Sequence, residues 1–169
     1  RHALTAIPGH PGLFQGRIPG DRPYLLEGRR SDGEAWQYED PYRFGPVLGQ
    51  MDEYLATEGT HQRLWPVLGA HVMAHEGVAG THFAVWAPNA QRVSVVGAFN
   101  FWDARRHVMR RRGSSGIWEI FLPDIGEGEP YKYALLGPDG AELPLKADPV
   151  GFGSEHAPSN ASIVRDISG

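Results

Sequence analysis

Alternation of apolar and polar side chains is the feature that most limits how the second half of this chain can fold. Runs with a two-residue period occupy 92–95, 118–122 and 131–135. Successive side chains of a β-strand point to opposite faces, so this period predicts strands with one buried face. Turn signals separate the runs, at 88–89, 114–116, 126–128 and 138–140. Short strands between such turns predict a β-sandwich of roughly 100 residues.

Composition supports an all-β fold and excludes several classes of function. The 169 residues include 22 Gly and 14 Pro, which suits a chain rich in turns. Cysteine is absent, which excludes disulfides and thiolate metal sites. The net charge of −4 argues against binding to nucleic acid. Apolar runs are too short to span a membrane, and the start of the chain does not have the pattern of a signal peptide.

Three segments are expected along the chain. Residues 1–45 carry short apolar stretches cut by turn signals, with strands at 12–18 and 24–27, and are interpreted as the C-terminal part of a β-domain. Residues 46–69 are interpreted as a helical connector because Met51, Tyr54 and Leu55 have helical spacing before Gly59. Residues 70–169 form the predicted sandwich. Because the chain begins with Arg1, it is interpreted as a fragment or a processed product.

The loop expected after the strand at 92–97 is the candidate binding site. It contains Phe99, Asn100, Phe101, Trp102 and Asp103. An aromatic ring can cover the C–H face of a sugar, while amide and carboxylate groups bind its hydroxyls. The pattern therefore favours carbohydrate, with Trp102 expected to expose its indole. The alternative is that these aromatic side chains fill the core of the sandwich.

Other residues have simpler interpretations. His71 and His75 lie about 13 Å apart if residue 70 begins a strand, too far for one metal, although on a helix they could chelate. Trp86 and Trp118 are expected in the core. The arginines at 105, 106, 110, 111 and 112 are interpreted as a solvated strand edge, with a nucleic-acid patch as the alternative. Signatures of nucleotide binding and of a nucleophilic serine are absent.

Several motifs together give the chain a recognisable pattern. The most specific are D-P-Y-R-F-G at 40–45, E-G-T-H at 58–61 with L-G-A-H at 68–71, F-A-V-W-A-P-N-A at 83–90, F-N-x-W-D at 99–103, Y-K-Y at 131–133 and K-A-D-P at 146–149. The chain resembles the N-terminal region of bacterial glycogen branching enzymes (1,4-α-glucan branching enzymes), including a family 48 carbohydrate-binding module. The two middle motifs, at 83–90 and 99–103, are shared with debranching enzymes and glycogen-binding regulatory modules. The motifs at 40–45 and 58–71 favour branching enzymes.

The resemblance implies a fold and a division of labour. Residues from about 70 onward would be an immunoglobulin-like β-sandwich that binds α-glucan, such as glycogen or maltooligosaccharide, weakly. The parent enzyme would be cytoplasmic and would form α-1,6 branches from α-1,4-glucan. Its catalytic (β/α)₈ barrel needs about 250 residues and would follow this chain and pack against it. The chain alone is therefore expected to be inactive, without catalytic residues, cofactor, metal, nucleic acid or membrane partner.

By the same resemblance, Trp102 and Lys132 match sugar-binding residues of glycogen-binding modules, and Asn160 matches a third approximately. Asn100 and Asp103 are the expected polar helpers. A second tryptophan of those modules is missing, since Asp139-Gly140 is followed by Ala141, Glu142 and Leu143. Ala98, Ala104 and Pro66 also depart from the usual pattern. Loss of one stacking platform predicts weak binding.

Two other functions remain open at this point. The chain could be a non-enzymatic glycogen-binding regulatory or scaffold module, or the accessory domain of a debranching enzyme. Trp102 could also be buried against the barrel or within the module itself instead of contacting glucan.

Overall fold

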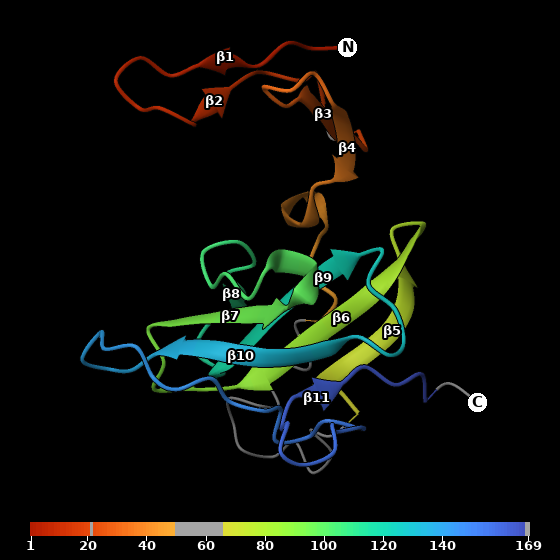
Figure 1. The fold of residues 1–169 in the computed structure, drawn as a ribbon, viewed down its shortest axis with the longest axis vertical. Helices are drawn as coiled ribbons and strands as arrows, with labels where there is room; N and C mark the ends of the chain where they lie inside the picture. The colour runs from red at the N-terminus through yellow and green to blue at the C-terminus, as the bar shows by residue number, and fades with distance from the viewer. Residues whose placement is uncertain (21, 50–65, 168–169) are drawn as a thin grey trace. The chain divides into compact units, whose positions relative to one another are not determined.

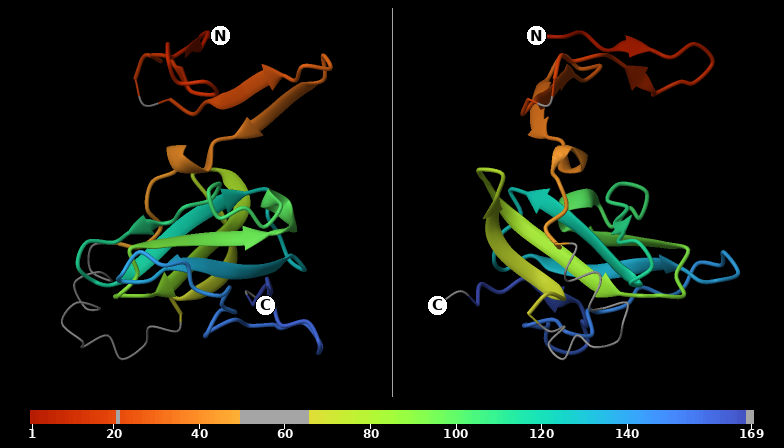
Figure 2. Two further views of the ribbon diagram at one scale, coloured as in Figure 1. Left: turned by 60° about the vertical axis from the view of Figure 1, so that its left-hand side comes forward. Right: turned by 180° about the vertical axis from the view of Figure 1, so that it is seen from behind.

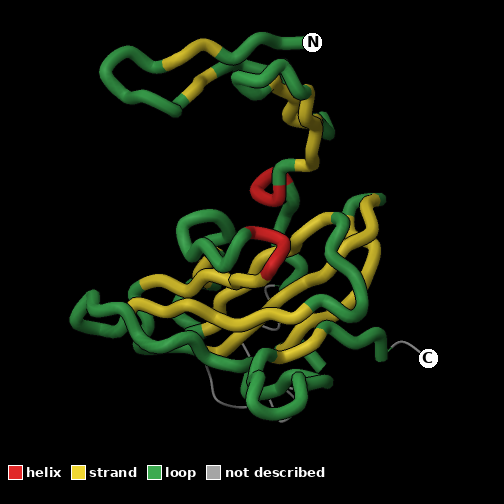
Figure 3. The backbone as a smooth tube through the Cα atoms, viewed as in Figure 1, coloured by secondary structure: helices red, strands yellow, loops and turns green. Residues whose placement is uncertain are grey.

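The computed structural model describes residues 1–20, 22–49 and 66–167. The chain divides into two compact units, Arg1–Glu39 and Asp40–Gly169. Among these residues, strands and loops dominate both units, and two single-turn 3-10 helices, η1 (Pro41–Arg43) and η2 (Ala98–Asn100), lie in the second unit (Figure 3). Most of the predicted helical connector, 50–65, lies outside the described residues.

The first unit consists of two antiparallel hairpins (Figure 1). Strands β1 (Thr5–Ala6) and β2 (Phe14–Gln15) form one hairpin, and β3 (Leu25–Arg29) and β4 (Ala35–Glu39) form the other. The ring of Trp36 lies across Gly28, where a Cβ atom would come within 2.4 Å of it. Two-stranded hairpins are marginally stable on their own, and several large apolar side chains of this unit are exposed.

The second unit is a sandwich of two antiparallel sheets (Figures 1 and 2). One sheet has the order β5-β6-β9-β8, with β5 Gly69–His75, β6 Val78–Trp86, β9 Ile117–Pro123 and β8 Arg110–Arg111. The other has the order β11-β10-β7, with β11 Ser162–Ile163, β10 Pro130–Leu136 and β7 Arg92–Gly97. The predicted all-β sandwich is confirmed, and the three alternating runs correspond to β7, β9 and β10.

The core lies between the two sheets. Alternate side chains from β6 and β9 meet alternate side chains from β7 and β10; these are Phe83, Val85, Trp118, Ile120, Leu122, Val93, Val95, Tyr131 and Tyr133. The rings of Phe83 and Tyr131 meet edge to face across this layer, with centroids 4.9 Å apart. Full burial of each large apolar side chain stabilises the fold by about 1.5–3 kcal/mol. Lys132, between two buried tyrosines, points to the other face, as predicted.

Residues 40–48 form a strap on the outer face of the four-stranded sheet. Asp40 caps η1 by accepting a hydrogen bond from the Tyr42 N–H, and Pro41 occupies the first helical turn. Phe44 is buried against Phe121, with ring centroids 4.9 Å apart. Leu48 joins a second apolar cluster with Ala84 and Ile117. This sheet is therefore covered on both faces.

The prediction that Trp86 lies in the core was wrong, and the prediction of a solvated arginine edge holds for Arg105, Arg106 and Arg111 but not for Arg110. Trp118 is buried as expected, but Trp86 is 55% exposed at the last residue of β6, although His82 and Ala84 on the same face of the strand are buried. Arg110 does not form a solvated edge, since its guanidinium donates hydrogen bonds to the carbonyls of Tyr42 and Phe44 at 2.7 and 2.6 Å. His71 and His75 lie on strand β5, which rules out the helical chelating arrangement.

Within the described ranges, none of the helices is long and apolar enough to cross a membrane.

Candidate functional site

The loop of residues 98–106, here named the Trp102 loop, follows strand β7 through the short helix η2. Phe101 and Trp102 both have left-handed backbone angles, with φ values of 59° and 58°. Residues other than glycine rarely adopt this backbone conformation, because their Cβ atom approaches the following carbonyl oxygen. Backbone hydrogen bonds hold it in place, from Phe101 N–H to the Ala98 carbonyl and from Trp102 N–H to the Gly97 carbonyl.

Asn100 is the buried support of this loop. Its Oδ1 accepts a hydrogen bond from the Gly97 N–H at 3.0 Å, and its Nδ2 donates to the Val95 carbonyl at 2.9 Å. Its Nδ2 also lies 2.9 Å from His107 Nδ1. Burial, with Arg106 nearby, lowers the pKa of His107, which favours the neutral ring that can accept this hydrogen bond. Asn100 was predicted to contact sugar, but its amide is enclosed and fully used in shaping the loop.

Two of the three aromatic side chains of the loop reach solvent, whereas Phe99 packs against the core of the sandwich. Trp102 is 41% exposed and Phe101 is 78% exposed. The expectation that this loop exposes the Trp102 indole is confirmed. Burial of Trp102 within the module itself, the alternative, does not occur.

Asp103 is engaged within the loop. Its carboxylate accepts two hydrogen bonds from the Arg105 guanidinium, at 2.9 and 2.8 Å, and one from the Arg105 N–H. Arg106 lies 3.8 Å from the same carboxylate. The Arg105 side-chain hydrogen bonds hold the pKa of Asp103 well below its usual range. Asp103 therefore stays ionised. Its carboxylate contacts Arg105 and Arg106, whereas the sequence predicted that it would help to bind sugar.

Lys132 and Asn160 come together from distant parts of the chain. Lys132 Nζ donates a hydrogen bond of 2.5 Å to Asn160 Oδ1. In the sheet Lys132 is the register partner of Val96, and the adjacent Gly97 accepts the Trp102 N–H. The backbone thus places the Trp102 loop next to the segment that carries Lys132. Of the predicted site residues, Trp102, Lys132 and Asn160 have polar or aromatic groups accessible to a ligand.

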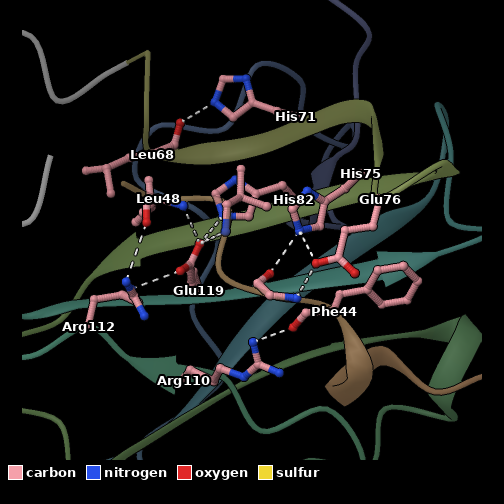
Figure 4. Close-up of polar contacts among 12 residues, drawn as sticks. Phe44, Leu48, Leu68, His71, His75, Glu76, His82, Arg110, Arg112 and Glu119 are labelled. Carbon is pink, nitrogen blue, oxygen red and sulfur yellow. Dashed lines mark hydrogen bonds and ion pairs between the residues drawn. The ribbon is translucent and has the colours of Figure 1, made fainter. Parts of the chain in front are cut away.

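A buried charge cluster centred on Glu119 was not anticipated from the sequence. Glu119 Oε2 lies 2.8 Å from His82 Nε2 and accepts hydrogen bonds from the N–H groups of Val47 and Leu48 at 3.2 and 3.1 Å. Arg112 Nε lies 3.0 Å from Glu119 Oε1. Figure 4 shows Glu119 between His82 and Arg112. The cluster fixes the end of the strap.

Electrostatics of this cluster favour the ionised carboxylate. Burial alone raises the pKa of Glu119, but the hydrogen bond from His82 and the donors of Leu48 and Arg112 outweigh it and lower the pKa overall. A second pair of contacts acts beside it, where Glu76 accepts the Gly45 N–H and His75 lies 2.9 Å from the Gly45 carbonyl (Figure 4). From the sequence, Glu119 between Trp118 and Ile120 was predicted only to face outward. Its burial depends on the strap, which is distant in the sequence.

A second buried carboxylate, Asp148, serves the core. Its Oδ2 accepts hydrogen bonds from the hydroxyls of Tyr131 and Tyr133 at 2.7 and 3.1 Å, and its N–H donates to Ser162 Oγ at 2.8 Å. Burial raises the pKa of Asp148, and the tyrosine hydroxyls oppose that shift. These contacts attach the K-A-D-P segment to β10 and β11. Among the described residues, the side chains do not form a cluster suited to a metal ion.

Comparisons with known proteins agree with this architecture. Residues 67–151 match the family described as carbohydrate-binding module 48 (isoamylase N-terminal domain). The 1,4-alpha-glucan branching enzyme GlgB of Roseobacter denitrificans is 63% identical over 161 residues, covering 94% of this chain and 22% of that protein. The GlgB of Mesorhizobium japonicum is 58% identical over 155 residues, covering 90% and 21%.

A solved structure shows the same fold. The maltotriose complex of a PulA variant from Klebsiella pneumoniae aligns with a TM-score of 0.51 and 22% identity, over 99% of this chain and 19% of that chain. The present chain spans about a fifth of the length of the curated relatives that it matches. On the match over 67–151, this chain belongs to the carbohydrate-binding module 48 family.

Proposed function

We propose that this chain is a non-catalytic, glucan-binding part of a glycogen branching enzyme. The relatives named 1,4-alpha-glucan branching enzyme, at 63% and 58% identity, support this parent over a debranching enzyme or a regulatory module. In such a parent, an α-1,4 link of the donor glucan is broken and the freed end is joined through a new α-1,6 link. The chain described here would hold the glucan while a catalytic barrel carries out that transfer in the cytoplasm.

The proposal rests on two observations, the half-exposed indole of Trp102 and the Lys132–Asn160 pair on the strand β10 that neighbours β7. The indole offers an apolar face to the C–H side of a glucose ring. The Lys132 ammonium donates hydrogen bonds, and the Asn160 amide both donates and accepts them. A sugar hydroxyl can thus replace or join the contact between Lys132 and Asn160. Asn100 and Asp103 act indirectly, by holding the loop.

Binding through this set is expected to be weak. Stacking of one aromatic ring contributes about 1–3 kcal/mol, if the value for nucleic-acid bases applies to sugars. A dissociation constant near 1 mM corresponds to about 4 kcal/mol, so one platform with two polar partners suits affinities of that order. Weak binding is useful in an accessory module because the enzyme must release the glucan chain after each transfer.

We also propose the domain boundaries set out from the sequence, with one change. Residues 70–169 are the carbohydrate-binding sandwich and 46–69 connect it to a preceding β-domain. Residues 1–45 were assigned to that domain from the sequence, but 40–45 pack on the sandwich as part of the strap, so the preceding domain ends at Glu39. The catalytic barrel of the parent packs against this region.

Titration with maltoheptaose tests the proposed function. Trp102→Ala is expected to abolish the change in tryptophan fluorescence and the chemical-shift changes seen with the wild-type chain at millimolar sugar. Trp86→Ala is the matched control, because Trp86 is also an exposed tryptophan but lies at the end of β6. A wild-type chain that does not respond to millimolar maltoheptaose, or an unchanged response in Trp102→Ala, contradicts the proposal.

A further inference from the structure

We infer that Phe101 and Arg106 form a second sugar-contacting subsite on the Trp102 loop. Long glucan chains contact this subsite as well as Trp102, whereas short ones contact Trp102 alone. This inference rests on the proposed function. It assigns a role to two residues that the sequence comparison with glycogen-binding modules did not single out. The subsite would supply an aromatic ring in addition to Trp102, in a chain that lacks the second tryptophan after Asp139-Gly140.

Exposure is the first observation. Phe101 is 78% exposed, more than any other large apolar side chain in the described part of the molecule. The next is Phe14, at 61%, in the hairpin unit. An apolar ring held in water does not contribute to the core, so its position is not explained by packing within the sandwich.

Backbone conformation is the second observation. Phe101 and Trp102 are consecutive non-glycine residues with φ near 60°, a conformation that carries strain. The loop keeps it because buried Asn100 and the N–H groups of both residues are hydrogen-bonded to β7 and η2. A glycine at either position would relieve the strain. The chain instead has two aromatic residues there, which presents both rings to solvent.

Consecutive left-handed residues also set the direction of the two rings. Helical backbone of either hand turns about 100° per residue, so the two side chains diverge around the local axis. Because their Cα–Cβ bonds point in different directions, the two rings are not expected to stack on one glucose ring from the same side. Each ring would serve a different glucose unit of the same chain, and a short oligosaccharide on Trp102 would not reach both.

Charge and hydrogen-bonding capacity complete the subsite. The Arg106 guanidinium lies over one face of the Phe101 ring, 5.2 Å from its centroid, and 3.8 Å from the Asp103 carboxylate. The cation–π contact and the ion pair orient Arg106 without using all five of its N–H donors. The subsite therefore combines an open aromatic face with donors for sugar hydroxyls, the same chemistry as Trp102 with Lys132.

The test is a titration of the full chain and its variants with maltotriose and maltoheptaose. Phe101→Ala is expected to weaken maltoheptaose binding about fivefold, the effect of losing one modest stacking contact, while maltotriose binding changes by less than about twofold. Phe101→Tyr, which keeps the ring, is expected to bind like the wild type. Arg106→Ala is expected to show a smaller loss, again confined to maltoheptaose.

Two further variants protect the interpretation. Phe101→Gly adopts the left-handed conformation without strain, so a loss of maltoheptaose binding with maltotriose binding retained cannot be attributed to a misfolded loop. Phe14→Ala, an exposed phenylalanine in the hairpin unit, is the matched control and is expected to bind both sugars normally. If Phe101→Ala and Phe101→Gly bind both sugars like the wild type while Trp102→Ala loses binding, this inference is overturned and the proposed function stands. If the wild-type chain binds neither sugar, the proposed function fails and the subsite with it.

Discussion

The Trp102 loop and the strap of residues 40–48 contain similar kinds of residues, but Phe101 and Trp102 are exposed in the loop, whereas Phe44 is buried in the strap. Each carries an aromatic motif and depends on one buried polar side chain, Asn100 in the loop and Glu119 beneath the strap. In the loop, the support holds aromatic rings out in water. Under the strap, the support draws Phe44 and Leu48 onto the sheet. An aromatic motif therefore indicates a ligand only when the fold leaves its rings exposed.

The comparison also shows what the D-P-Y-R-F-G motif does in the structure. Asp40 caps η1, Phe44 packs on Phe121, and Gly45 binds Glu76 through its N–H. Arg110 reaches two carbonyls of the same segment. These contacts describe how the strap is attached to the sandwich. The motif specifies architecture, whereas F-N-x-W-D supplies the exposed loop that we propose binds sugar.

Glu119→Ala is expected to have the largest effect, and it falls on stability. It leaves His82, Arg112 and two strap N–H groups without their buried acceptor, which costs about 3–5 kcal/mol. Urea unfolding measures this free energy, with the exposed Glu142→Ala as control. A loss below about 1 kcal/mol would show that the strap does not depend on Glu119.

Asn100→Ala is expected to have the next largest effect, on both stability and binding. It exposes the Gly97 N–H and the Val95 carbonyl to an empty site, at a cost of about 2 kcal/mol. Maltoheptaose binding should weaken as well, because Trp102 loses its supported conformation. Unfolding and titration of the same sample measure the two effects, with the exposed Asn89→Ala as control. Normal maltoheptaose binding in Asn100→Ala would show that binding does not depend on the loop conformation that Asn100 supports.

Acid should weaken the attachment of the strap to the sandwich more than it weakens the proposed contact between the Trp102 loop and sugar. Because folding lowers the pKa of Glu119 below its ordinary value of 4.5, the stabilisation is present above that pH and is lost as pH falls through the folded pKa. The difference in unfolding free energy between wild type and Glu119→Gln should therefore shrink from about pH 5 to pH 3. Urea unfolding across this range measures it. A difference that stays constant, or grows, would contradict the charged state assigned to Glu119.

Trp102→Ala is expected to have the smallest effect on stability. Its partly exposed ring contributes little to the core, so the unfolding free energy should change by less than about 1 kcal/mol while maltoheptaose binding is lost. Thermal unfolding and titration compare the two. A large loss of stability would mean that Trp102 is mainly a packing residue.

The strand pattern made much of the sandwich predictable. Alternation placed Trp118 and Ile120 toward the core and Lys132 away from it, because side-chain direction in a strand depends only on local spacing. The same logic, applied to Phe83 and Val85, predicts that Trp86 faces outward. The error at Trp86 came from treating a large aromatic residue as core by type.

The supports of both regions were not predictable in the same way. Glu119 is buried because the strap, about 70 residues earlier, lies over it. Asn100 looked like a sugar ligand because amides suit hydroxyls, but its partners are in β7 and at His107. Local sequence indicates which face a side chain takes, whereas the segment that later covers that face is a tertiary property. Asn160 beside Lys132 is another contact of this kind, and only the resemblance pointed to it.

The most direct test of the account is to map maltoheptaose binding residue by residue with backbone and side-chain NMR shifts on the full chain. The contrast between an exposed binding loop and a buried structural strap predicts that shifts concentrate at Phe101, Trp102, Lys132 and Asn160. Signals of Phe44, His82 and Glu119 should stay unchanged at saturating sugar. Shifts centred on the strap, with the Trp102 loop unaffected, would contradict the central claim.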